Sequence, residues 1–329
     1  MEEIPRFIVG LPRAGSTWLC RTLNCHQDIF AFGETMYWGK RYTYPNSLGQ
    51  YNYASLRKVF NNLTSIDYET TVGIQGYGNS QYLNRDRIVE ILTTVLTNID
   101  LPTAPGTFFN DFCSLMAEAE QKKFWIEKTP HHIHYYDRIL NFLSNAHFIV
   151  LLREPYSFIL SYKHQKGHKN TVESRKRFKD RYHPIGCALV WKRTCNKAHQ
   201  LLKKHPENCL IVDYSELFSD TDNVLRKILS FLHISSDNLI ADGDPLFSSF
   251  DSGKKPKLQA RDIFWMNLIA GPEIRRMGYK IEIKKFNIVD IIDIIRSFLD
   301  IPLWIFRLIK DTRTICGKTT FKYLFRYIS

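Results

Sequence analysis

A phosphate-binding loop is the first pattern with chemical meaning, in the segment FIVGLPRAGSTWL near the amino terminus. Gly10, Gly15 and Thr17 hold the spacing of G-x-x-x-x-G-K-[ST], but Ser16 stands in place of the lysine. Because that lysine reaches the β and γ phosphates of a nucleoside triphosphate, its absence argues against a γ-phosphate ligand. Backbone N–H groups, the positive end of the following helix and the guanidinium of Arg13 would still hold an anion. We therefore predict a site for a small phosphate or sulfate that needs no metal, although a glycine turn that binds nothing shares the pattern.

A second anion site is predicted from HFIVLLREPYSFILSYKH at residues 147–164. Arg153 ends an apolar strand, and Ser161 lies in the helix that follows. In open α/β sheets, ligands bind at the carboxyl ends of the strands. Arg153 and Ser161 are therefore expected beside the first anion site, unless Arg153 is a buried ion-pair residue.

Two further motifs supply a candidate base and a candidate cation. Glu34 lies in FGETMYW, where aromatic neighbours would disfavour its charge and make it more basic. Lys128 lies in WIEKTPHH at the end of a strand and is expected to face the same crevice. An in-line displacement needs a base for the incoming hydroxyl and positive charge on the departing oxygen. The alternatives are a capping or solvated carboxylate for Glu34 and a surface lysine for Lys128.

Histidines follow Lys128 closely in the sequence. His131, His132 and His134 form a group of three that could suggest a metal site. Since no cysteine or paired carboxylate completes a ligand set, we predict no metal site there.

The elements that would position these residues follow an α/β pattern. Four short apolar runs, each followed by a helical pattern, are predicted as buried parallel strands covered by helices on both faces. The strands are expected at residues 6–11, 124–127, 147–153 and 209–213. The helices are expected from residue 16 onward and at residues 133–143, 156–165, 185–204 and 216–232. The predicted fold class is α/β, with three layers (α/β/α) and a central parallel sheet.

Three stretches interrupt or follow this pattern. Residues 40–119 are rich in tyrosine and asparagine and are predicted as an inserted cap on the acceptor side, around one helix at 85–98. Residues 163–181 carry eight Lys or Arg against two acids and are predicted as a mobile loop. The main domain would span residues 1–280, followed at 281–329 by a basic amphipathic helical extension. The apolar stripe of this extension would pack on the domain, or lie on a membrane surface or a partner.

Composition narrows the classes of function. The 329 residues include 45 Lys and Arg against 33 Asp and Glu, and the net charge of +12 suits an anionic cofactor, an acidic substrate, nucleic acid or a membrane face. Seven cysteines without C-x-x-C spacing indicate reduced thiols in a cytoplasmic protein. The first residues lack the features of a signal peptide, and no run reaches the roughly 18 apolar residues that span a bilayer. We therefore expect any membrane contact to be peripheral.

The two anion motifs together resemble a known family. P-R-x-G-[ST]-[ST]-W after the first strand, with R-x-P and then S-Y-x-H after a central strand, is similar to the sulfotransferases that use 3′-phosphoadenosine 5′-phosphosulfate. The resemblance covers roughly residues 5–280 and is weakest across 40–119. It implies a P-loop-like nucleotide-binding fold and a donor with one 5′-phosphate capped by sulfate. Such a donor has no γ-phosphate and requires no metal, so the missing lysine is accounted for.

The resemblance also implies roles for individual residues. Glu34 would be the base, while Lys128 and Arg13 would neutralise the departing phosphate. Because the cytosolic small-molecule branch of the family uses a histidine base, His131 and His132 compete with Glu34 for that role. Tyr214 in IVDYSEL would lie near the adenosine, unless it is a packed core tyrosine. The residues implied in donor binding are Arg13, Ala14, Gly15, Ser16, Thr17 and Trp18 for the phosphosulfate, Arg153 and Ser161 for the 3′-phosphate, and Ser252, Lys255 and Lys257 from a late basic loop that is otherwise a solvated charge run.

The predicted reaction is transfer of a sulfo group to a hydroxyl or amine, with adenosine 3′,5′-bisphosphate as the second product. The basic loop and the tyrosine-rich insertion favour a carbohydrate or glycolipid acceptor, ahead of protein tyrosine and small phenols. A P-loop kinase or NTPase is the main alternative, and the missing lysine stands against it. A basic nucleic-acid or membrane-binding protein is the non-enzyme alternative; because the charges are spread and no reading motif accompanies them, we expect no nucleic-acid partner.

Overall fold

A computed structural model of the chain describes residues 4–64, 85–164, 182–236 and 257–316. The chain divides into two compact units. The first comprises Met1–Leu152 with Ala198–Pro245, and the second comprises Arg153–Lys197 with Leu246–Ser329.

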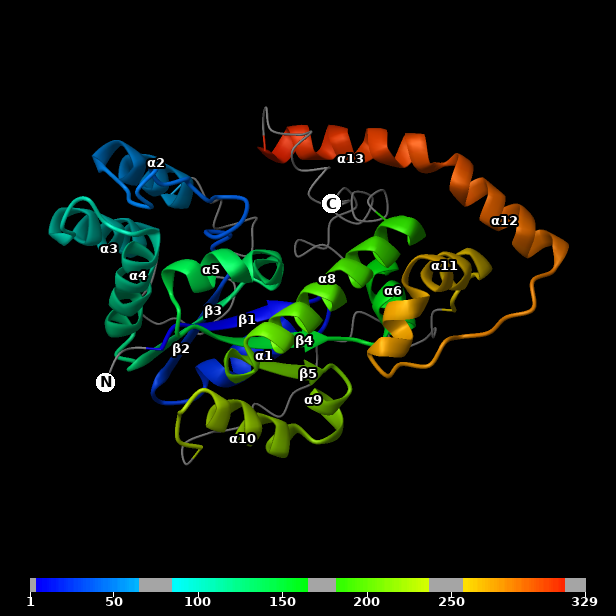
Figure 1. Cartoon of the computed structure of the whole chain (residues 1–329), viewed down its shortest axis with the longest axis horizontal. Coiled ribbons are helices and arrows are strands. Elements are labelled where there is room, and N and C mark those ends of the chain that lie inside the picture. Colours follow the sequence, from blue (N-terminus) through cyan, green and yellow to red (C-terminus); the bar gives the residue numbers. More distant parts are fainter. Residues whose placement is uncertain (1–3, 65–84, 165–181, 237–256, 317–329) are drawn as a thin grey trace. The chain divides into compact units, whose positions relative to one another are not determined.

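A five-stranded sheet forms the centre of the first unit, and all its neighbouring strands are parallel. The strand order is β2-β3-β1-β4-β5, so β1 lies in the middle (Figure 1). The strands are β1 (Arg6–Gly10), β2 (Ile29–Gly33), β3 (Phe124–Lys128), β4 (His147–Leu152) and β5 (Cys209–Asp213). Parallel strands are buried on both faces, which explains why they read as continuous apolar runs. The predicted α/β class with a central parallel sheet is confirmed.

β2 is a correction to the four strands predicted from the sequence. Its residues IFAFG are all buried and pair with β3 from Ile29 opposite Phe124 to Gly33 opposite Lys128. Only four residues separate β2 from the end of the first helix, so the strand follows that helix too closely to stand out as a separate run. As a result, Glu34 directly follows a strand of the sheet.

Helices cover the sheet on both sides. Figure 1 shows α5 (Tyr136–Phe142) on one side of the strands and α9 (Glu216–Ser219) with α10 (Thr221–Phe231) on the other. The first helix, α1 (Ser16–Asn24), packs Trp18 against Phe218 of α9, with 5.1 Å between the ring centroids. The three predicted layers are therefore present.

Two predicted helices differ from the structure. In place of one helix at 133–143, a 3-10 helix, η2 (Pro130–Tyr135), precedes α5, and His132 N donates to Thr129 O at 2.9 Å to close the tighter turn. The helix predicted at 216–232 divides into α9 and α10 because the backbone of Asp220 leaves the helical region. A short 3-10 helix, η3 (Pro206–Asn208), precedes β5.

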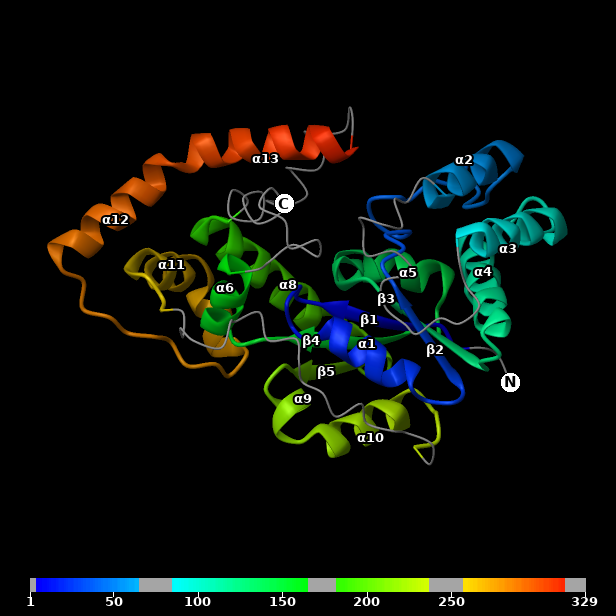
Figure 2. The same cartoon turned by 180° about the vertical axis from the view of Figure 1, so that it is seen from behind.

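In its described residues the insertion holds three helices where one was predicted. α3 (Arg85–Asn98) has the predicted bounds, and α2 (Tyr53–Thr64) and α4 (Pro105–Ala119) join it. Figure 2 shows the three helices gathered together beyond the β2 edge of the sheet. α4 packs on the sheet through Phe109, whose ring stacks on Phe7 of β1 at 6.0 Å. The apolar spacing of α2 and α4 was in the sequence, but the surrounding tyrosines and asparagines hid it. Residues 65–84 lie outside the described part.

The second unit is helical in its described residues. It contains α6 (Pro155–Lys163), α8 (Pro184–Lys204, whose last turns belong to the first unit), α11 (Ala260–Arg276), α12 (Ile288–Leu299) and α13 (Ile301–Cys316). Lys163 of α6 pairs with the buried Asp262 of α11 at 2.9 Å, and Tyr156 donates a hydrogen bond to Asn267. Most of the predicted basic loop at 163–181 lies outside the described residues. Within the described residues, no helix is both long enough and apolar enough to cross a membrane.

Candidate active site

The phosphate-binding loop joins β1 to α1 in the strand–turn–helix context that the motif requires. Gly10 ends β1 with φ 122°, and a Cβ there would lie 2.2 Å from the carbonyl oxygen of Leu151 on β4. Gly15 precedes α1 with φ 84°, a conformation that residues with a Cβ rarely adopt. Both glycines are therefore required by the backbone, and α1 presents the N–H groups of its first turn at the end of the loop.

Arg13 also has a left-handed backbone, with φ 67°. This conformation is uncommon for a residue other than glycine and occurs often at functional sites. Tyr214 lies on the other side of the loop: a Cβ on Gly15 would come within 3.3 Å of its ring. Tyr214 is held by a bond from its N–H to Leu152 O at 2.8 Å and by ring contact with Phe218. The structure thus places Tyr214 next to the predicted phosphosulfate loop. Within that loop and the start of α1, Ala14, Ser16 and Trp18 are buried and Thr17 is half-buried.

Glu34 and Lys128 meet at the carboxyl ends of β2 and β3. Because Gly33 pairs with Lys128 in the sheet, the residue after Gly33 is brought to the lysine. The Nζ of Lys128 lies 2.7 Å from Oε1 of Glu34. The side chain of Lys128 is fully buried and that of Glu34 is 21% exposed, so the lysine is not a surface residue.

Gly33 gives the lysine its room. A Cβ at Gly33 would lie 2.3 Å from Lys128 O and 2.9 Å from Lys128 Cε. The glycine in F-G-E therefore lets the lysine side chain pass directly over the neighbouring strand. Burying an unpaired ammonium costs free energy, and the ion pair with Glu34 offsets part of that cost for Lys128.

Glu127 is a buried carboxylate beside the candidate site that the sequence analysis missed. Its buried carboxylate accepts hydrogen bonds from Thr35 N at 3.0 Å, Thr35 Oγ1 at 2.9 Å and Thr129 Oγ1 at 2.5 Å through one oxygen. Its other oxygen lies 3.0 Å from Nδ1 of His132. Burial opposes its ionisation, but the His132 ring and the hydrogen-bond donors together hold the pKa of Glu127 below its usual value. The available signal was a carboxylate inside a buried strand, which requires partners.

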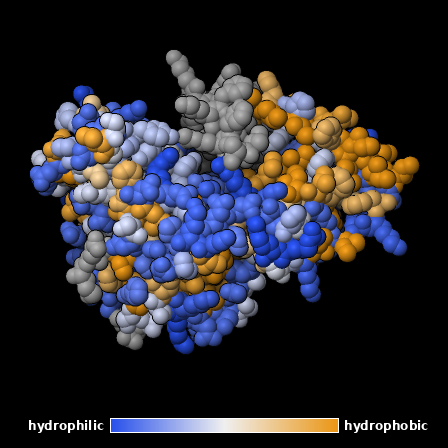
Figure 3. Space-filling model, viewed as in Figure 1, coloured by the Kyte–Doolittle hydropathy of each residue, from blue (hydrophilic) through white to orange (hydrophobic). Residues whose placement is uncertain are grey.

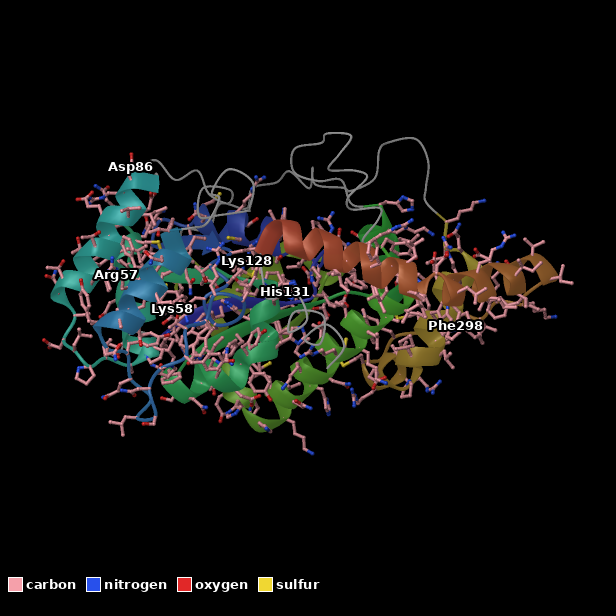
Figure 4. The ribbon with its side chains drawn as sticks, turned by 90° about the horizontal axis from the view of Figure 1, so that it is seen from above. Arg57, Lys58, Asp86, Lys128, His131 and Phe298 are labelled. Atoms are coloured by element: carbon pink, nitrogen blue, oxygen red, sulfur yellow. The ribbon has the colours of Figure 1, made fainter. Side chains whose placement is uncertain are left out.

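The histidines differ in their surroundings. His132 is buried and bound to Glu127, and its ring also contacts Phe7. His131 is half-buried, with its ring 6.2 Å from that of His134. Figure 4 labels Lys128 and His131 on the segment that ends β3 and follows it. Of the two histidines weighed as a base, His132 is the one whose ring is bound to Glu127. The described residues contain no group of three or more His, Cys, Asp or Glu side chains arranged to hold a metal ion.

The residues of the second anion motif belong to the second unit. Arg153 directly follows β4 and is 8% exposed, and its carbonyl accepts a hydrogen bond from Trp191 Nε1 at 2.9 Å. Glu154 caps α6 through Tyr156 N and Ser157 N, and Ser161 is buried two turns along that helix. Of the three residues predicted from the late basic loop, Lys257 is exposed, while Ser252 and Lys255 lie outside the described residues.

The sheet, the lysine-free loop and the Glu34–Lys128 pair define a P-loop-like α/β nucleotide-binding fold. The chain belongs to the sulfotransferase family, whose family model matches residues 5–238. It is an enzyme of the sulfotransferase class and not a P-loop kinase or NTPase.

Solved structures of similar fold are also sulfotransferases. The chain is similar to the sulfotransferase domain of the Synechococcus PCC 7002 olefin synthase, at 18% identity and a TM-score of 0.50, over 85% of this chain and 98% of that one. It is also similar to the sulfotransferase domain from the curacin biosynthetic pathway (16%, TM-score 0.49, 85% and 100%) and to sulfotransferase STF9 from Mycobacterium avium (11%, TM-score 0.47, 86% and 79%). Identities this low show the fold alone. Among curated proteins, none matches the chain.

Glu127→Gln is expected to lower stability at neutral pH and to make stability less sensitive to acid. The folded state holds the pKa of Glu127 below the unfolded value of 4.5, so the carboxylate stabilises the fold above that pH. Its contribution is lost as the pH falls through the lower, folded pKa. Thermal unfolding at about pH 7 and about pH 3.5 should show the Tm difference between wild type and variant narrowing in acid.

Glu118→Gln, at an exposed position on α4, is the control and should follow the wild type at both pH values. A Tm difference for Glu127→Gln that is the same at both pH values would contradict the expected role of its charge.

Proposed function

We propose that this sulfotransferase takes its sulfo group from 3′-phosphoadenosine 5′-phosphosulfate and transfers it to a hydroxyl group. The observation that carries the proposal is the ion pair between Glu34 and the fully buried Lys128, in the same unit as the lysine-free loop. A base beside a buried cation is the arrangement that in-line sulfuryl transfer needs. The loop suits a donor with one 5′-phosphate, because it lacks the lysine that would reach a γ-phosphate.

In this mechanism Glu34 accepts the proton of the attacking hydroxyl. The acceptor oxygen forms a bond to sulfur while the bond from sulfur to the bridging phosphate oxygen breaks, and the electron pair stays on that oxygen. Lys128 and Arg13 stabilise the resulting negative charge. Lys128 and Glu34 contact each other in the structure. When substrates bind, the acceptor hydroxyl would take the place of Lys128 beside Glu34, and the bridging oxygen would take the place of Glu34 beside Lys128.

The remaining donor contacts follow the family resemblance. The segment from Arg13 to Trp18 binds the phosphosulfate, and Tyr214, which packs beside Gly15, lies near the adenosine. Arg153 and Ser161 bind the 3′-phosphate, because the planar guanidinium can donate two parallel hydrogen bonds to two oxygens of a tetrahedral phosphate. Ser252, Lys255 and Lys257 would contribute from the late basic segment. No residue is assigned to a metal, since the donor needs none.

A carbohydrate or glycolipid is the proposed acceptor. The insertion carries exposed aromatic rings, with Tyr44 at 65% and Tyr53 at 72% exposure. Arg138 lies over the ring of Tyr42 at 4.0 Å and near that of Tyr44 at 5.5 Å, so cations and aromatic faces occur together. Aromatic faces pack well on sugar rings, and a guanidinium attracts an anionic glycan. A cytoplasmic location, inferred from the unpaired spacing of the cysteines, belongs to the same proposal.

Binding of adenosine 3′,5′-bisphosphate to the full chain tests the donor. Calorimetry should show binding that persists in EDTA and that ATP does not displace. Transfer of radiolabelled sulfate from the donor to a panel of glycans, glycolipids, tyrosine peptides and phenols then tests the acceptor class. Binding of ATP that depends on Mg²⁺, without binding of the bisphosphate, would refute the donor assignment.

Glu34→Gln is expected to keep affinity for the bisphosphate and to lose turnover by roughly two to four orders of magnitude, the usual effect of removing a general base. Asp28→Asn is the matched control, because it breaks another carboxylate–lysine pair of the same unit, that with Lys123 at 2.9 Å, and should keep turnover. Near-normal turnover of Glu34→Gln would contradict this role and favour His131 or His132 as the base.

A further inference from the structure

An exposed apolar face runs along α12 and α13 of the second unit. Figure 3 shows hydrophobic residues gathered over these helices. Phe298, labelled in Figure 4, lies on α12 and is 58% exposed. The apolar face consists of Ile288, Val289, Ile291, Ile292, Ile295, Phe298, Leu299, Leu303 and Phe306, each more than a third exposed. A continuous patch of large aliphatic side chains is unusual on a surface in contact with water alone.

The opposite side of these helices already has partners within its own unit. The carbonyl of the buried Ser297 accepts a hydrogen bond from His183 Nε2 at 2.9 Å, and its hydroxyl accepts one from Trp265 Nε1 at 2.8 Å. Trp304 of α13 stacks on the His183 ring at 4.8 Å. These helices are therefore held by their inner side, and Phe298 of the apolar face also stacks on Trp265, with 6.2 Å between the ring centroids. Ile291, Ile295 and Leu299 of the same face are 48%, 53% and 68% exposed.

The charge around the apolar face selects the kind of partner. Residues 281–329 contain nine Lys or Arg against five Asp or Glu, and after Asp300 the ratio is six to one. Arg296 and Arg307 are exposed on the two helices. A second copy of the chain would bring these cations together with their equivalents, whereas an anionic lipid surface would neutralise them.

We propose that α12 and α13 lie on an anionic membrane surface with the apolar face in the headgroup region. Helices with an aliphatic face, flanking cations and insufficient length to span a bilayer bind in this way. α12 has 12 residues and α13 has 16, so neither is long enough to cross the hydrocarbon core. A membrane-bound enzyme would meet lipid-linked acceptors at its own surface.

Flotation of the full chain with vesicles tests the proposal. Phosphatidylcholine vesicles that contain about 30% phosphatidylserine should bind the wild type, with binding that weakens as salt rises, and phosphatidylcholine alone should bind it less. The triple variant Ile291→Gln, Ile295→Gln, Leu299→Gln should partition at least about tenfold more weakly. Its Tm should stay near that of the wild type, because all three side chains are exposed.

A matched triple variant removes exposed apolar side chains elsewhere. Leu48→Gln, Tyr53→Gln and Leu268→Gln change residues that are 62–80% exposed, and this variant should float with the vesicles as the wild type does. Equal binding of the α12 variant and the wild type, or no binding of the wild type to either vesicle, overturns the proposal. A dimer of the wild type that the α12 variant fails to form would assign the apolar face to a second copy instead.

A second inference concerns Glu127 and rests on the proposed roles of Glu34 and Lys128. The Glu127 carboxylate holds Thr35, the residue after Glu34, and Thr129, the residue after Lys128. It therefore ties together the two chain segments that carry the base and the cation. We infer that Glu127 and Thr129 are positioning residues that set the distance between Glu34 and the lysine.

Thr129→Val tests this inference because it removes one hydroxyl and conserves shape. Turnover should fall by about tenfold, since a small displacement of a reacting group is costly, while bisphosphate affinity stays unchanged. Thr129→Ser restores the hydroxyl and should restore turnover. Thr194→Val is the control: it removes a buried hydroxyl that has no hydrogen-bond partner among the described residues, and it should not change turnover.

Equal turnover of Thr129→Val, Thr129→Ser and wild type overturns the positioning role, as does loss of bisphosphate binding together with turnover. A wild type that neither binds the bisphosphate nor transfers sulfate refutes the proposed function instead, so the two failures are distinct.

Discussion

The parallel pairing of β2 with β3 is the constraint on which the candidate site depends. In a parallel pair both strands end at the same edge, so residues that are distant in sequence leave the sheet side by side. Gly33 opposite Lys128 fixes the next residue, Glu34, within 2.7 Å of the lysine ammonium. The same edge receives the loop after β1, which pairs with β3 as well. The proposed base, the proposed cation and the predicted anion loop thus come from three strand ends of one sheet.

Burial gives this arrangement its electrostatic strength. The ammonium of Lys128 and the carboxylate of Glu127 are both excluded from water, yet their side chains leave neighbouring positions of one strand and so point to opposite faces. Each has its own partners: Glu34 for the lysine, and Thr35, Thr129 and His132 for the glutamate. The two buried charges therefore have separate partners, and the hydrogen bonds of Glu127 link the segments that carry Glu34 and Lys128.

The sequence allowed much of this to be predicted, because strong local signals mark it. The loop glycines, the strand-ending Arg153 and the K-T-P lysine belong to motifs, and four strands stood out as apolar runs. β2 was missed since it follows α1 after four residues, and α2 and α4 were missed within a tyrosine-rich stretch. Glu127 was not assigned, because one of its partners, Thr35, is distant in the sequence and depends on the pairing of β2 with β3, while Thr129 and His132 follow it closely. The apolar stripe of the extension was predicted, but only the structure shows which side of it packs.

Cys20 on α1 gives the site a further chemical property. Burial raises the pKa of its thiol to about 12, although the nearby Lys128 works in the opposite direction. Oxidants and electrophiles attack the thiolate form, which is scarce at such a value. Among the described cysteines, Cys20 lies close to the Glu34–Lys128 pair, and its thiol is expected to react slowly with oxidants and electrophiles. Changes in cellular redox state, and covalent inhibitors aimed at thiols, would reach the exposed Cys25 at the end of the helix before they reached the reaction centre.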